Sequence, residues 1–190
     1  MTEPAMSNTS QVIAEAEHVR RAANAAFGAL SSEQINWKPS PNEWSIAQCL
    51  EHLILLNTSY FPRIEKILAG ERRSSLWERA PLLPAFFGRL VLAAVQPESK
   101  GKVKARPAFT PASGHIDIGI LTRFLTHQEN LIRLMKATAQ LPTEKIIITS
   151  AVSPVVTYSL FDAYRILISH ELRHMRQAEK VLRARGFPRS

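Results

Sequence analysis

The hydrophobic positions repeat with the spacing of an α-helix in four long segments of the chain, each followed by turn-forming residues. Ser7 or Asn8 can cap the first segment, Ser45 can cap the second, and Gly70 and Gly186 end the second and fourth. The segments span residues 8–30, 46–68, 113–141 and 159–184. Four long amphipathic helices predict an all-α fold, namely a four-helix bundle.

A long crossover, residues 74–113, joins the second predicted helix to the third, and we expect it to form a lid or a dimer contact. Its most apolar run, residues 80–95, is interrupted by Pro84 and Arg89 and is too short to span a bilayer. This run predicts a partly buried helix or an interface element, with a helix lying on a membrane surface as the alternative.

Two shorter connections also have recognisable patterns. The connector of residues 31–45 is rich in turn residues but contains Trp37 and Trp44, so we expect it to be held against the bundle. Residues 145–149 could form a short strand, but no partner strand is evident. An extended linker is therefore the favoured interpretation.

Composition narrows the class of protein without naming a function. The chain has 190 residues, 45% of them hydrophobic and 21% charged, which indicates one soluble domain, residues 1–190. The net charge of +8 permits anionic partners, but the basic stretch 100–107 lacks interleaved aromatic residues, so we expect no nucleic-acid partner. A single cysteine, Cys49, and no evident signal peptide predict a cytoplasmic protein.

The candidate chemistry lies in the fourth segment, in the stretch His170-Glu171-Leu172-Arg173-His174. At about 100° per residue, both histidines and Glu171 fall on the apolar side of the helix. The basic side chains gather on the opposite side, namely Arg165, Arg173, Arg176, Lys180 and Arg183. Burying an unsatisfied polar group costs about 1–3 kcal/mol. A metal ion would satisfy both imidazoles, and hydrogen bonding within the core is the alternative.

The same letters match the HExxH pattern of zinc proteases, in which the glutamate activates water. The rest of that pattern is missing, because Gln177 and Lys180 stand where an extended motif has its glycine and third histidine. A protease of this class is therefore disfavoured. The best third ligand is His52, beside the apolar face of the second helix. We expect a surface or packing position for His18, and a surface or helix-start position for His115 and His127.

Taken together, these residues resemble a family. The segment Trp44-Ser45, followed by Leu50-Glu51-His52 and by the terminal His170-x-x-x-His174, is similar to the DinB/YfiT-like superfamily of metal-binding four-helix bundles. The resemblance covers essentially the whole chain. It implies one divalent metal ion, zinc or nickel, held by His52, His170 and His174, and homodimers are common in the family. The family name refers to DNA damage induction and does not imply DNA binding.

The resemblance also implies a reaction class. Characterised members are thiol-dependent S-transferases and isomerases that use mycothiol, bacillithiol or glutathione, and many others are described as metal-dependent hydrolases. We therefore expect an enzyme that acts on a small molecule, with a low-molecular-weight thiol as a possible co-substrate and Glu171 as the candidate base or as an orienting residue. The alternatives are a bundle that binds a metal or ligand without turnover and, less favoured, a nucleic-acid-binding protein.

Overall fold

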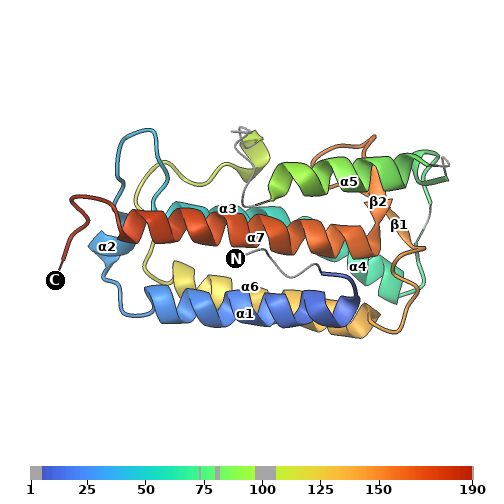
Figure 1. Ribbon diagram of the computed structural model, residues 1–190, viewed down its shortest axis with the longest axis horizontal. Coiled ribbons are helices and arrows are strands. Elements are labelled where there is room, and N and C mark those ends of the chain that lie inside the picture. Colours follow the sequence, from blue (N-terminus) through green and yellow to red (C-terminus); the bar gives the residue numbers. More distant parts are fainter. Residues whose placement is uncertain (1–5, 73, 80–81, 97–105, 190) are drawn as a thin grey trace.

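The four amphipathic segments form a helical bundle in the computed structural model, which describes residues 6–72, 74–79, 82–96 and 106–189 (Figure 1). The bundle helices are α1 (Thr9–Phe27), α3 (Ile46–Thr58) with its continuation α4 (Phe61–Leu68), α6 (Ile120–Thr138) and α7 (Leu160–Leu182). Helices α1 and α3 each pack against both α6 and α7. The prediction of an all-α bundle is confirmed, with one small sheet added.

Side-chain caps begin three of these helices where the sequence predicts. The side chain of Asn8 accepts a hydrogen bond from the backbone of Gln11, and Ser45 and Ser159 cap α3 and α7 in the same way. These caps satisfy backbone N–H groups that have no partner inside the helix. Helix α1 ends at Phe27, earlier than the predicted residue 30, and a short helix α2 (Ser32–Asn36) follows.

The second predicted helix is broken, contrary to the expectation of one helix over residues 46–68. Helix α3 ends at Thr58, and α4 begins at Phe61, with Pro62 in its first turn. Proline has no N–H group, and its ring clashes with the carbonyl group four residues earlier, here that of Thr58. The chain therefore starts a new helix at this point.

The third predicted helix begins later than expected, at Ile120 and not at Ser113. The side chain of Asn36 donates to the carbonyl oxygen of Ile116 at 2.8 Å and accepts from its N–H group at 2.9 Å. These contacts hold the backbone of Ile116 outside a helix, while its side chain is still buried in the core. The helical spacing of apolar residues thus extends from α6 into the loop before it, and this is why the sequence predicted an earlier start.

Residues 147–149 form a strand, so the interpretation of this stretch as a linker is wrong. Strand β1 (Ile147–Thr149) pairs antiparallel with β2 (Thr157–Ser159), and Ile148 lies opposite Tyr158. Strand β2 directly precedes α7, and its three residues are all buried. A strand of this length has too little alternation to be recognised in the sequence.

The crossover contributes an outer layer. Helix α5 (Leu83–Val95) packs against α7 and β2 at the edge of the bundle (Figure 1), and the 3₁₀ turns Trp77–Arg79 and Pro107–Phe109 lie on either side of it in the sequence. The partly buried helix predicted for residues 80–95 is thus present over residues 83–95, and residues 80 and 81 lie outside the described part of the chain. The basic stretch 100–107 lies outside the described residues except for Arg106 and Pro107. Within the described part of the chain, no helix is long and apolar enough to cross a membrane.

Candidate metal centre

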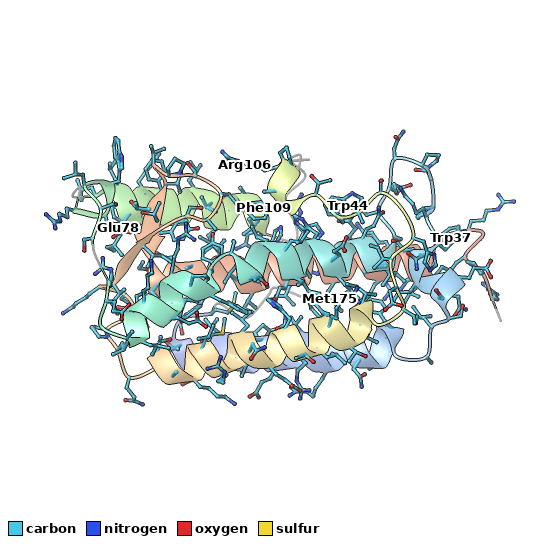
Figure 2. The ribbon with its side chains drawn as sticks, turned by 180° about the vertical axis from the view of Figure 1, so that it is seen from behind. Trp37, Trp44, Glu78, Arg106, Phe109 and Met175 are labelled. Atoms are coloured by element: carbon cyan, nitrogen blue, oxygen red, sulfur yellow. The ribbon has the colours of Figure 1, made fainter. Side chains whose placement is uncertain are left out.

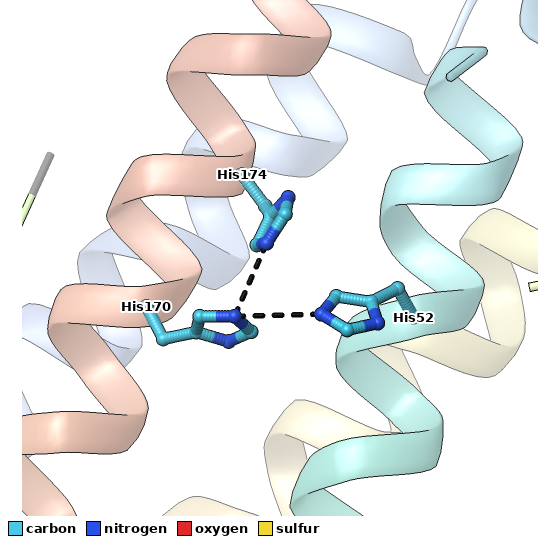
Figure 3. A group of neighbouring side chains, drawn as sticks. All are labelled: His52, His170 and His174. Carbon is cyan, nitrogen blue, oxygen red and sulfur yellow. Dashed lines mark hydrogen bonds between the residues drawn. The ribbon is translucent and has the colours of Figure 1, made fainter. Parts of the chain in front are cut away.

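Three histidines from two neighbouring helices come together inside the bundle (Figure 3). The Nε2 atom of His170 lies 3.4 Å from Nε2 of His52 on α3 and 3.1 Å from Nε2 of His174, one turn further along α7. One ring nitrogen from each residue lies within 4.8 Å of the other two. The structure thus assembles the three residues that the sequence analysis selected.

The orientation of His52 is set by the crossover. Its Nδ1 atom lies 2.6 Å from the carbonyl oxygen of Phe109 in the 3₁₀ turn Pro107–Phe109. A carbonyl oxygen can only accept, so Nδ1 is the ring atom that bears the hydrogen. The lone pair of Nε2 therefore points towards His170 and His174.

Burial keeps the three imidazoles neutral. It lowers the pKa of His52, while the hydrogen bond to Phe109 opposes this effect. Burial lowers the pKa of His170 well below the ordinary value, and so does the repulsion that a second proton in the cluster would meet from His174, His52 and Arg173. Burial, with the same kind of repulsion from His52 and Arg173, lowers the pKa of His174 to about 3. Metal ligation requires neutral imidazole, so all three side chains are in the form that binds a cation at pH 7.

The spacing of the nitrogens fits a divalent ion. Two nitrogens bound tetrahedrally to zinc at about 2.0–2.1 Å are about 3.3–3.4 Å apart. The two separations that involve Nε2 of His170, 3.1 and 3.4 Å, are close to this value, and the ring nitrogens of the third pair lie within 4.8 Å of each other. Nε2 of His52 bears no hydrogen, so it can only accept a hydrogen bond. Nε2 of His170 faces the Nε2 atoms of both His52 and His174, and one hydrogen atom cannot serve both neighbours. Without a cation, at least one nitrogen lone pair of the cluster therefore has no partner. A cation satisfies all three, and imidazole ligands suit zinc and nickel.

An aromatic residue from the connector covers one side of the cluster. The ring of Trp44 stacks on His174, with centroids 5.6 Å apart, and lies 4.9 Å from the ring of His52. Figure 2 shows Trp44 and Phe109 along the same side of α3. Trp37 packs edge-on against Phe187. The expectation that this connector is held against the bundle is confirmed.

Glu171 is fully buried beside the cluster, but its carboxylate points to other partners. Its Oε1 atom accepts hydrogen bonds from Nδ2 of Asn57 on α3 and from Nε2 of Gln128 on α6, each at 2.5 Å. Burial raises the pKa of Glu171 to about 8, and the two amide hydrogen bonds oppose this shift. Among the described residues, no hydrogen bond joins this carboxylate to a histidine of the cluster. Base and orienting residue, the two roles expected for Glu171 from the sequence, therefore both stay predictions.

Sequence reasoning missed Asn57 and Gln128, the two partners of Glu171. Each is a fully buried polar residue among mostly apolar core positions of its helix. A polar residue at a core position in a helical repeat was the available signal.

The remaining histidines lie outside the cluster. His18 is exposed, and Nε2 of exposed His115 lies 3.0 Å from the hydroxyl group of Ser32. His127 is buried and stacks on Phe61, with ring centroids 5.0 Å apart. The surface or helix-start position expected for His127 is therefore wrong, because α6 turns this side chain onto α4.

Comparison with known proteins identifies one family. The family model described as DinB superfamily matches residues 15–178, a range that includes His52, His170 and His174. No curated protein and no solved structure matches the chain.

Proposed function

This chain belongs to the DinB superfamily, and we propose that it is an enzyme that uses one divalent metal ion held by His52, His170 and His174. The proposed reaction is the thiol-dependent transfer of a group to sulfur, or hydrolysis, on a small-molecule substrate. Zinc or nickel is the proposed metal. The observation that supports this proposal most directly is the convergence of three ring nitrogens, with Nε2 of His170 at 3.4 Å from Nε2 of His52 and at 3.1 Å from Nε2 of His174.

Three protein ligands are the number that catalytic zinc sites use, because they leave a coordination position for water or substrate. When bound, a divalent cation at this position lowers the pKa of a thiol or a water molecule, so that the anionic nucleophile forms near neutral pH.

The chain's own residues provide the surroundings of that reaction. The Phe109 carbonyl group fixes the tautomer of His52. Trp44 shields the rings of His52 and His174 from water on one side. Glu171, bonded to Asn57 and Gln128, ties α7 to α3 and α6 next to the ligands and so orients the two histidines of α7.

A bundle that binds a metal without turnover is the alternative function. It predicts the same metal content but no product in any thiol-transfer or hydrolytic assay.

The test begins with the metal content of the purified protein, measured beside the double variant His170→Ala/His174→Ala. The matched control is His127→Ala, which removes a buried histidine outside the cluster. We expect about one zinc or nickel ion per chain in the wild type and in the control, and none in the double variant.

Thermal unfolding with and without a chelator gives a second measurement. Free metal at a thousandfold excess over its dissociation constant stabilises a protein by about 4 kcal/mol. We expect this stabilisation in the wild type and its loss in the double variant. Equal metal content in all three proteins would contradict the assigned ligands, and unchanged thiol-transfer turnover in His174→Ala would contradict the assigned reaction.

We also propose that the protein is a cytoplasmic homodimer. The exposed apolar residues of the crossover support a contact between two copies at α5. They include Leu82, Phe86 and Leu90, which are 85%, 60% and 56% exposed.

A further inference from the structure

Three side chains of α3 hold the end of the crossover, close to the metal centre. Gln48 donates from Nε2 to the carbonyl oxygen of Ala112 at 2.8 Å. The N–H group of Ala112 donates to Oε2 of Glu51 at 2.6 Å. His52, the next residue, meets the carbonyl oxygen of Phe109. The first two contacts engage both the carbonyl oxygen and the N–H group of Ala112. The third engages Phe109, three residues earlier in the chain.

We propose that Glu51 is a positioning residue of the metal centre, which holds Ala112 so that the Phe109 carbonyl group reaches Nδ1 of His52. This inference rests on the metal-binding function proposed above. Glu51 does not contact the ligand atoms and acts through the backbone of residues 109–112.

The backbone between the two contact points transmits the position of Ala112 to Phe109. Phe109 is the last residue of a 3₁₀ turn, in which its N–H group bonds to the carbonyl oxygen of Arg106 at 2.9 Å. Pro111 has a fixed φ angle and is buried. The segment between Phe109 and Ala112 therefore has little freedom once Ala112 is held.

Of the two side chains that hold Ala112, Glu51 makes the stronger hydrogen bond. An N–H group that donates to a carboxylate forms a hydrogen bond about twice as strong as one between neutral groups. Gln48 is also engaged at the start of α3, where its side chain accepts from the backbone N–H group of Ser45 as part of the helix cap. Glu51 has no such second role among the hydrogen bonds of the described residues.

The expected consequence is a change in metal affinity. Removing a hydrogen-bond partner of a metal-ligating histidine costs about 10–100-fold in affinity. Glu51 lies one step further from the metal, so we expect about a tenfold loss for Glu51→Ala, at the lower end of that range. Glu51→Gln keeps a side-chain oxygen that accepts from Ala112, in a weaker hydrogen bond, and should lose clearly less affinity than Glu51→Ala.

The matched control is Asn36→Ala. Asn36 holds Ile116, in the loop that follows the crossover, by two hydrogen bonds. Ile116 lies further along the chain from Phe109 than Ala112 does. A general loosening of the crossover would weaken metal binding in this variant too, whereas the proposal expects its affinity to stay within about twofold of the wild type.

The experiment measures the zinc affinity of the wild type, Glu51→Ala, Glu51→Gln and Asn36→Ala by competition with a chelator. In the cobalt-loaded proteins, NMR records how fast the Nδ1 proton of His52 exchanges with water. We expect faster exchange in Glu51→Ala only. Unfolding of the metal-free proteins establishes that each variant is folded, which the partial exposure of Glu51 favours.

The outcomes separate the inference from the proposed function. If the wild type binds zinc and Glu51→Ala has the same affinity and the same proton exchange, the inference fails and the proposed function stands. The inference also fails if Glu51→Gln is as weak as Glu51→Ala, or if Asn36→Ala loses as much affinity. If the wild type itself binds no zinc or nickel, the proposed function fails.

Discussion

The indole ring of Trp44 lies on the imidazole ring of His174, with their centroids 5.6 Å apart and their planes 24° apart. Trp44 comes from the connector between α2 and α3, whereas His174 lies near the other end of the chain on α7. This contact excludes water from one side of the cluster, and burial is the first cause of the low pKa of His174. The connector is therefore part of the centre.

Replacement of Trp44 should weaken metal binding most strongly in acid. In Trp44→Ala the rings of His52 and His174 become more exposed, so their pKa values rise towards the ordinary value and protons compete with the metal. We expect a larger loss of zinc affinity at pH 6 than at pH 7.5, measured by chelator competition. Trp44→Phe, which keeps an aromatic ring, is the control. An equal loss at both pH values would show that shielding is not the cause.

The buried His127 should make the protein less stable in acid. Burial lowers its pKa to about 4, so the folded state stays neutral while the unfolded state takes up a proton near pH 6.5. The resulting decrease in the free energy of unfolding is absent above pH 6.5 and grows as the pH falls to about 4, where it reaches about 3 kcal/mol. His127→Phe should remove this part of the pH dependence, as measured by denaturant unfolding at several pH values. The same slope in both proteins would contradict the prediction.

Gly88 should be required for the packing of α5. A Cβ atom at this position would lie 2.8 Å from Oδ2 of Asp162, which belongs to the first turn of α7. Alanine favours a helix over glycine by about 1 kcal/mol, but overpacking costs about 1–3 kcal/mol. We expect Gly88→Ala to lower the free energy of unfolding, with Ala93→Gly on the exposed side of α5 as a measure of helix propensity alone. A more stable Gly88→Ala would show that α5 can move away from Asp162.

The exposed face of α5 should control the oligomeric state. Charges introduced by Phe86→Glu and Leu90→Glu would be buried between two copies, at a high desolvation cost. We expect the double variant to be monomeric by light scattering at concentrations where the wild type is a dimer. Ile118→Glu, which changes an exposed apolar residue before α6, should leave the mass unchanged. A wild type that is itself monomeric would rule out the proposed homodimer.

The sequence was sufficient for the bundle and for its three histidines. Helical spacing of apolar residues reports which face of a helix is buried, and the caps at Asn8, Ser45 and Ser159 mark where helices begin. The spacing of His170 and His174 placed both on the buried face of one helix. His52 was selected because it lies beside the apolar face of the second predicted helix, and the resemblance to a family supported joining it to the other two. The spacing along one helix does not by itself show which residues of another helix it contacts.

Tertiary structure decided the features that depend on partners distant in the chain. The hydrogen bonds of Asn36 keep Ile116 outside α6, although the apolar spacing there is helical. Strand β1 forms because β2 lies beside it. The proton on His52 is fixed by the Phe109 carbonyl group, and Glu171 faces Asn57 and Gln128, since the packing of α7 on α3 and α6 sets its direction. Local periodicity determines which side chains are buried, whereas hydrogen-bond partners across the fold determine what a buried polar group can do.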